Sequence, residues 1–409
     1  ATYLSYLNQE QCQNAELAAT LTLLELPNLL ALLDCSQATT DPETTINRAT
    51  SLYSMLQRLG KPRLLERVAR VRDVAIAALA EGWSHARFEA SRTVIEQHLA
   101  ENRLGDALAG SKKLLQQAQK AGEQAYASSD YDLAMAIHLL GSVLRETGDV
   151  DRALALEQDA TRRFEEVDNK RQSKSAKRMA AICLSGQGDC LLLLGRFKEA
   201  EKTYVNVIKS AVLRGDQRSA AVGKSKLGTA LQYQLGRKEA ISVLAEARDI
   251  FMNLNEPGSV ATIWHQIGIL HEADGQPKEA EKSYNEALLI TVRLGNQRKQ
   301  AGTLLQLGNL YANHLARPED AAAFYRRAVE VYAAVGDLKG EGFASNNLAG
   351  TLVRLNSFDA ARKAAKRAIE CNLPFGHAAE PWTTWSILCS VKQKAGNPVA
   401  AEEAQQQAR

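Results

Sequence analysis

Small and apolar residues recur along most of the chain with a spacing of about forty residues. Alanines repeat at intervals of 46, 47, 40, 40, 41, 40 and 40 residues, at Ala107, Ala153, Ala200, Ala240, Ala280, Ala321, Ala361 and Ala401. A second small residue stands twelve or thirteen positions before most of them, at Gly141, Gly188, Gly228, Gly268, Gly308 and Ala349. Such a fixed period is typical of repeat proteins.

A tight turn is predicted between the two small positions of each period. The turn residues are Gly148, Gly195, Gly236, Gly275, Asn356 and Gly396. Gly and Asn tolerate the positive φ that ends many helices. Each period therefore predicts two helices, which the small residues allow to approach closely. Because one helix pair cannot bury its apolar face alone, the pairs must stack. We expect an all-α, superhelical solenoid of antiparallel helix pairs.

These positions resemble the tetratricopeptide repeat, over about residues 85–409. The family's Leu-Gly, Ala and aromatic positions are matched by Leu227, Gly228 and Ala240, then by Ile267, Gly268, Ala280 and Tyr284, and then by Leu307, Gly308, Ala321 and Tyr325. Trp264 stands at the family's Trp position. The resemblance implies a right-handed superhelix whose concave groove binds proteins or peptides.

The period is longer than the roughly 34 residues of the standard repeat. With a repeat of 40–42 residues, this chain resembles the repeat arrays of kinesin light chains and of polarity adaptors. The segment 345–349, Ser-Asn-Asn-Leu-Ala, is similar to a kinesin light chain motif, and Leu307-Gly308-Asn309 to a polarity adaptor motif. The extra residues extend the second helix of each pair, which we expect to end at Gly215-Asp216, Gly295-Asn296 and Gly336-Asp337.

The repeat divides the chain into three parts. Residues 85–377 form the expected array, 1–84 an N-terminal helical cap or degenerate repeats, and 378–409 a degenerate, Gln-rich capping pair. Residues 36–45 are expected to form a polar loop, with a helix starting near Asp41-Pro42.

Composition narrows the class of protein. Hydrophobic residues make up 45% and charged residues 24%, which excludes a disordered chain. Fifty basic against 47 acidic residues leave a net charge of +3, too little for a general nucleic-acid surface. The six cysteines are irregularly spaced, so we expect reduced thiols and a cytoplasmic protein. The most apolar stretch, 17–33, is short and interrupted, so we expect no membrane span.

The first helix of each pair is expected to line the concave groove. Positions two, five, nine and twelve of that helix face it, with mixed apolar and uncharged polar residues. Asn and Gln amides offer both a donor and an acceptor to a peptide backbone. We expect an extended or helical partner segment there, and the resemblance adds the idea of an asparagine clamp. The candidate residues are His138, Arg145, Asp189, Gln232, His265, Glu272, Asn309, Phe343, Asn346 and Asn347.

A basic insertion, 168–178, lengthens one period to 47 residues. Its five basic residues are Lys170, Arg171, Lys174, Lys177 and Arg178. One interpretation is a grip for an acidic partner or phosphates. The interpretation we favour is a solvated extension of two helices. Nucleic-acid binding through this run is the least favoured function.

No catalytic, phosphate-binding or metal-binding motif is found. His265 and His271 are six residues apart, which does not place them on one helical face. We expect no enzyme, no cofactor and no metal. A rival hypothesis rests on resemblance to the ligand-sensing regions of bacterial signal-transduction ATPases. The start at Ala1 fits a fragment of such a protein, whose upstream domain would give the output. Compact Ala- and Leu-rich units indicate a bacterial source, and self-association through the end repeats stays open.

Overall fold

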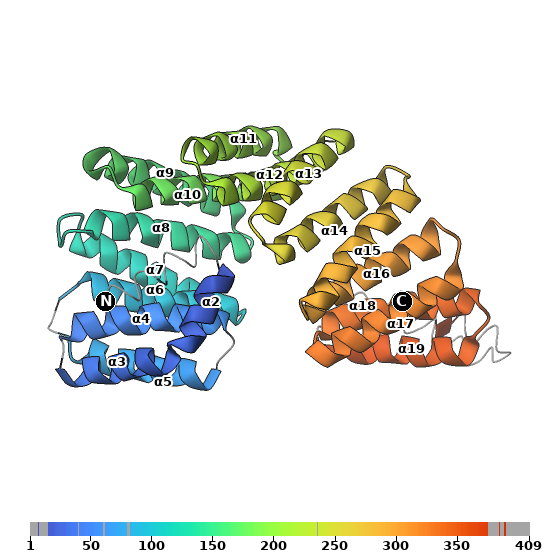
Figure 1. Cartoon of the computed structure of the whole chain (residues 1–409), viewed down its shortest axis with the longest axis horizontal. Helices are drawn as coiled ribbons and strands as arrows, with labels where there is room; N and C mark the ends of the chain where they lie inside the picture. The colour runs from blue at the N-terminus through green and yellow to red at the C-terminus, as the bar shows by residue number, and fades with distance from the viewer. Residues whose placement is uncertain are drawn as a thin grey trace. The chain divides into compact units, whose positions relative to one another are not determined.

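The computed structural model describes residues 7, 15–39, 41–59, 62–79, 82–234, 236–374, 384, 388 and 389. These residues are almost all helical, and no strand occurs among them. The chain separates into two compact units, unit 1 (Ala1–Gly215) and unit 2 (Asp216–Arg409). Each unit is a run of helices in which every helix packs mainly on its neighbours in sequence (Figure 1). The predicted all-α solenoid is confirmed.

Unit 1 begins with four helices and continues with three helix pairs. Within each pair the chain reverses in a short turn, which makes the two helices antiparallel. The helices are α2 (Ala15–Leu24), α3 (Leu26–Thr39), α4 (Pro42–Arg58), α5 (Pro62–Ala77), α6 (His85–Ala100), α7 (Leu104–Ala121), α8 (Ser129–Glu146), α9 (Val150–Arg171), α10 (Lys174–Leu193) and α11 (Phe197–Leu213).

Unit 2 is the more regular array. Its first helices start at residues 217, 257, 297 and 338, so the predicted period of about forty residues is confirmed. The helices are α12 (Gln217–Tyr233), α13 (Arg237–Asn253), α14 (Pro257–Ala273), α15 (Pro277–Arg293), α16 (Gln297–Asn313), α17 (Pro318–Val335), α18 (Leu338–Arg354) and α19 (Phe358–Asn372). Most of the predicted capping pair 378–409 lies outside the described residues. None of the described helices combines the length and the apolar character needed to cross a membrane.

The turns follow the predicted chemistry with two corrections. Gly148, Gly195, Gly275 and Asn356 have positive φ, as expected, whereas Gly236 has a φ of −78° and serves as the N-cap of α13. Gly396 lies outside the described residues. The expected polar loop 36–45 is much shorter, because α3 continues to Thr39 and α4 begins at Pro42.

The shortening of the predicted loop 36–45 has a local cause. The Ser36 hydroxyl donates to the backbone oxygen of Leu32, and the Thr45 hydroxyl donates to that of Ser36, so these polar side chains bond to the helix backbone. The predicted helix start is confirmed, since the Asp41 carboxylate accepts from the Thr44 amide at 2.9 Å. The Thr44 hydroxyl also donates to this carboxylate, at 2.6 Å, and the hydrogen bonds from the Thr44 hydroxyl and amide lower the pKa of Asp41.

Between pairs, a Gly followed by an Asx residue ends one helix and begins the next. Gly215, Gly295 and Gly336 have positive φ, and the residue after each accepts from a backbone amide of the following helix. An Asx side chain satisfies one of the amides that a helix start leaves without a partner. The predicted ends of the second helices are therefore confirmed.

In several repeats, the two helices of a pair are held together by a tyrosine ring that packs against a glycine. Tyr284 of α15 is fully buried, and a Cβ built on Gly268 of α14 would lie 2.5 Å from its ring. The same contact joins Gly188 to Tyr204 and Gly308 to Tyr325, while Leu244 covers Gly228. The glycine is required because any side chain would occupy the volume of the ring.

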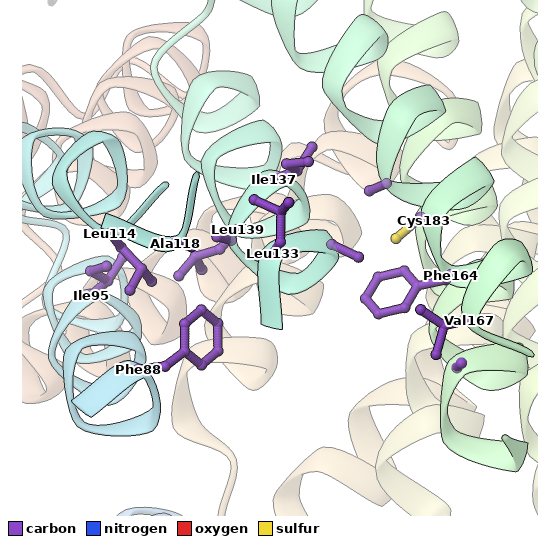
Figure 2. Close-up of a cluster of buried hydrophobic side chains, with 14 of the residues drawn as sticks. Phe88, Ile95, Leu114, Ala118, Leu133, Ile137, Leu139, Phe164, Val167 and Cys183 are labelled. Carbon is purple, nitrogen blue, oxygen red and sulfur yellow. The ribbon is translucent and has the colours of Figure 1, made fainter. Parts of the chain in front are cut away.

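Unit 1 has its own apolar core across α6 to α10. Phe88, Leu114, Ile137 and Phe164 are buried in it, and Figure 2 shows their side chains converging between the helices. The ring of Phe164 meets that of Tyr131 edge-on, with centroids 5.1 Å apart. This geometry is favourable for aromatic pairs.

A polar cluster sits at the start of α8, beside this core. The buried Asp132 carboxylate accepts from the Tyr126 hydroxyl at 2.8 Å and pairs with His85 Nδ1 at 2.7 Å. The hydrogen bond to Asp132 raises the pKa of His85, and the negative charge of Asp132 adds to the effect. A buried carboxylate needs such partners.

Gly268→Ala is expected to destabilise the protein by about 1–3 kcal/mol, because the new methyl group overpacks the Tyr284 ring. Gly258→Ala is the matched control on the same helix, where a Cβ meets only the end of Leu294 at 3.8 Å. That change should be neutral or stabilising by up to about 1 kcal/mol. Urea unfolding monitored by circular dichroism measures both, and equal stability of the two variants would contradict the tight contact.

His85→Gln is expected to change how stability depends on pH. The pKa of His85 is raised in the folded state above 6.5, the ordinary value for histidine. The His85–Asp132 pair therefore contributes its full stabilisation below pH 6.5, and this stabilisation is lost as the pH rises through the folded-state pKa. The stability difference between parent and variant should therefore shrink as pH rises from 6 to 9. Unfolding free energies at several pH values test this, and a difference that does not depend on pH would argue against the charged pair.

Candidate functional site

A stripe of partly exposed residues follows the first helices of unit 2. On α14, Thr262, His265, Ile269 and Glu272 are half-buried, whereas Ile263, Ile267, Gly268 and Leu270 are buried. The same spacing recurs on the other first helices. We call this set the inner stripe, and its members are Val222, Ser225, Thr229, Gln232, Thr262, His265, Ile269, Glu272, Leu305, Asn309, Phe343, Asn346, Asn347 and Val353.

Polar residues of the inner stripe and its flank connect successive first helices. The Ser225 hydroxyl donates to Gln266 at 3.2 Å, linking α12 to α14. His265 Nδ1 lies 3.2 Å from the Thr303 hydroxyl, linking α14 to α16. The Asn347 amide donates to Asn309 Oδ1 at 3.0 Å, linking α16 to α18. The stripe is thus hydrogen-bonded from one repeat to the next.

The predicted asparagines are engaged within the protein. Asn309 Oδ1 also accepts from the Tyr325 hydroxyl at 2.8 Å, and its Nδ2 donates to Gln306 at 3.1 Å. Asn346 Oδ1 accepts from the Thr384 hydroxyl at 2.9 Å. The structure therefore brings Asn309 and Asn347 into direct contact, while Asn346 bonds to a residue beyond α19.

The other predicted residues of unit 2 differ in their surroundings. Glu272 accepts from the Tyr284 hydroxyl at 2.8 Å and lies 3.4 Å from His314 Nε2. Burial lowers the pKa of His265, and the Lys299 charge lowers it further. Phe343 is 55% exposed, an unusual position for a phenylalanine, and Gln232 is half-buried.

In unit 1 the predicted residues lie in polar contacts between helices. His138 Nδ1 on α8 lies 2.8 Å from Glu157 Oε2 on α9. Arg145 Nη1 lies 3.9 Å from Asp189 Oδ2, and Asp189 Oδ1 accepts from the Tyr204 hydroxyl at 2.7 Å. The first and third contacts join the two helices of one pair, and the contact between Arg145 and Asp189 links α8 to α10 of the next pair.

The basic insertion consists of two helix ends and a two-residue turn. α9 extends to Arg171, Gln172 adopts positive φ, and α10 starts at Lys174. Arg171 pairs with Asp130 at 2.8 Å. All five basic side chains are exposed. The favoured interpretation, a solvated extension of two helices, matches this geometry.

Sequence reasoning missed the importance of Glu157. This residue is fully buried, although it stands four positions after Ala153, where other repeats have Tyr204, Tyr284 and Tyr325. The replacement of an aromatic by a carboxylate was visible in the aligned repeats. Cys183 lies beside it, and burial raises the pKa of the Cys183 thiol, with the Glu157 charge as a second cause.

Sequence reasoning also missed a cavity in unit 1 of about 860 Å³, between α6 and α7. Its wall combines apolar residues such as Trp83, Val94 and Leu114 with basic ones. All charged or titratable side chains among its described lining residues are basic, and they are Arg87, His98, Lys113 and Lys120. Such a cavity has the volume and composition of a small-molecule site.

Comparison with known proteins places these repeats in a family and the fold among solved structures. A family model described as tetratricopeptide repeat matches residues 219–290 and 299–372. A signal transduction ATPase with numerous domains (STAND) from Pyrococcus horikoshii, which has a tetratricopeptide repeat sensor, is similar at 14% identity with a TM-score of 0.63. That alignment covers 90% of this chain and 53% of the other, so this chain spans about half of that protein.

Two Rap structures are similar over their whole length. A Rap protein complexed with Competence and Sporulation Factor aligns at 12% identity and a TM-score of 0.53, covering 90% of this chain and 100% of the other. The apo form of RapI aligns at 12% identity and a TM-score of 0.55, covering 91% and 96%. At these identities the likeness concerns the fold alone. Together with the forty-residue period, the family match shows that residues 219–290 and 299–372 are tetratricopeptide repeats of the long form.

Proposed function

We propose that this chain is a non-catalytic binding module that holds a segment of a partner protein on the inner stripe of unit 2. The observation that supports this most is the continuity of the stripe across α12, α14, α16 and α18. Its cross-helix hydrogen bonds fix the side chains before a partner arrives, and a preformed surface loses less conformational entropy on binding.

The chemistry of the stripe suits a peptide. Ile269, Leu305 and Phe343 offer apolar contacts for side chains, and hydroxyls and amides between them offer hydrogen bonds. An amide has two donor hydrogens and two acceptor lone pairs. Asn347 donates one hydrogen to Asn309, which leaves capacity for a peptide backbone. We therefore keep the asparagine clamp as part of the proposal, in which Asn347 hydrogen-bonds to the backbone of the bound peptide.

The similar structures support a binding role of this kind. One Rap structure is a complex with Competence and Sporulation Factor, and it shares the fold over 90% of this chain. Cys35, Cys183, Cys190, Cys371 and Cys389 are free thiols, which supports a reducing, cytoplasmic location. We propose no catalytic role for any residue of the stripe.

Phe343→Asp is expected to abolish partner capture, because it places a charge in the apolar part of the stripe. Leu289→Asp on α15 is the matched control, since Leu289 is 52% exposed and lies outside the stripe. Proteins captured from host lysate by the parent are identified by mass spectrometry, and binding to the purified partner is then titrated. We expect at least a tenfold loss for Phe343→Asp, about the effect of 1.4 kcal/mol.

Circular dichroism must show equal helicity in both variants. Equal loss of capture in both would indicate a general effect of charge. Unchanged capture by Phe343→Asp would place the binding surface elsewhere and overturn the proposal.

A second candidate function is a ligand sensor within a larger signal-transduction ATPase. The basic and apolar cavity of unit 1 favours it, because that lining suits a small organic anion with an apolar body. The likeness to the STAND protein with its tetratricopeptide repeat sensor supports it as well. The gene sequence upstream of Ala1 bears on this directly, since an ATPase domain encoded there would favour the sensor.

The double variant Lys113→Glu/Lys120→Glu is expected to weaken binding of the anionic dye anilinonaphthalene sulfonate by at least tenfold. Lys112→Glu is the control, because Lys112 is exposed on α7 but does not line the cavity. The neutral analogue phenylnaphthylamine should bind all three proteins alike. Fluorescence titration measures these affinities, and equal dye affinity in the double variant would exclude the cavity as an anion site.

A further inference from the structure

One repeat of unit 1 buries a carboxylate where the others bury a ring. Tyr204, Tyr284 and Tyr325 fill the space between their paired helices, and Glu157 of α9 takes the equivalent place with no exposed surface. A buried charge is unfavourable unless other groups neutralise it. This departure from the repeat calls for a local chemical reason.

Three successive helices bring a donor atom to this point. His138 of α8, Glu157 of α9 and Cys183 of α10 place a ring nitrogen, a carboxylate oxygen and a sulfur within 4.8 Å of one another. His138 Nδ1 and Glu157 Oε2 are 2.8 Å apart. Among the described residues, this is the one group of at least three His, Cys, Asp or Glu side chains with such spacing.

A glycine on α10 makes room for the carboxylate, whereas a Cβ on a second glycine, on α8, would lie in ordinary contact with the Glu157 side chain. A Cβ built on Gly186 of α10 would lie 2.9 Å from Glu157 Cδ and from Oε1. A Cβ on Gly141 of α8 would lie 3.5 Å from Glu157 Cγ. Cys183 borders the apolar cluster that contains Phe164 and Ile137 (Figure 2). The site is therefore a polar cluster bordered by apolar side chains.

We propose that His138, Glu157 and Cys183 bind a zinc ion. Zinc accepts nitrogen, oxygen and sulfur donors together, and three protein ligands leave a fourth, open position in a tetrahedral site. The ion takes the place of the proton between Nδ1 and Oε2. With bonds of about 2.0–2.1 Å, a tetrahedral arrangement separates these two atoms by about 3.4 Å, which requires a small movement of the side chains.

The open position faces the side of His138. This imidazole is 17% exposed, whereas Glu157 and Cys183 are fully buried, so an ion and its water reach the site past the ring. The Ser142 hydroxyl lies 3.5 Å from Glu157 Oε1 on the same helix as His138. It is placed to orient the carboxylate, as outer-shell partners do at metal sites.

The alternative is a metal-free ion pair between a protonated His138 and Glu157. In that alternative the Cys183 thiol donates a hydrogen bond to Glu157, whereas in a zinc site its sulfur binds the metal directly. A spectroscopic signal of a metal–sulfur bond therefore separates the two explanations. Cys183→Ser removes the proposed ligand, and Cys190→Ser is the matched control, since Cys190 is a second fully buried cysteine on α10 outside the cluster.

The experiment uses the full chain purified without chelators. Elemental analysis should find one zinc per chain. After exchange with cobalt, the parent and Cys190→Ser should show an intense near-ultraviolet thiolate-to-cobalt band, which Cys183→Ser lacks. His138→Gln should weaken zinc affinity by more than the roughly 10–100-fold seen for outer-shell changes.

Absence of the cobalt band in the parent would overturn the proposal, as would its persistence in Cys183→Ser. Circular dichroism checks that each variant folds. If Cys183→Ser loses helicity, His138→Gln decides, because a cobalt band unchanged in that variant would place the metal at another cysteine and overturn the proposal. None of these outcomes bears on the inner stripe of unit 2, which the variants leave unchanged.

Discussion

The contact between a buried tyrosine ring and a glycine on the paired helix determines the geometry of this protein. Tyr284 and Gly268 are its clearest example, and the small residue fixes how closely the two helices approach. The same contact recurs between Gly188 and Tyr204 and between Gly308 and Tyr325, whereas Leu244 covers Gly228. In these repeats it sets how closely the two helices of a pair approach.

The same tyrosines join the core to the candidate binding surface. Their rings lie in the core, while their hydroxyls donate to Asp189, Glu272 and Asn309, which stand on the first helices. Tyrosine suits this position because it has an apolar body and a polar end. The residues that stabilise the solenoid therefore also orient the polar side chains that we propose for partner binding.

Two positions where the sequence departs from the repeat pattern differ in their structural consequences. Glu157 breaks the aromatic pattern, and the helices on either side of it supply His138 and Cys183. By contrast, the basic insertion lengthens the period, and its five basic side chains are exposed on two lengthened helix ends. A change at a buried position must be compensated by its neighbours, whereas a change at an exposed position need not be.

The sequence by itself determined the helix pairs, their period and most of the turns, because small residues, turn glycines and Asx caps act over a few residues. It misjudged the loop 36–45, where hydroxyls bond to the helix backbone. Only the tertiary structure showed that Asn309 and Asn347 meet, that the chain forms two units, and that Glu157, His138 and Cys183 converge. These contacts join residues 19 to 45 positions apart, and their distances depend on how the helices stack.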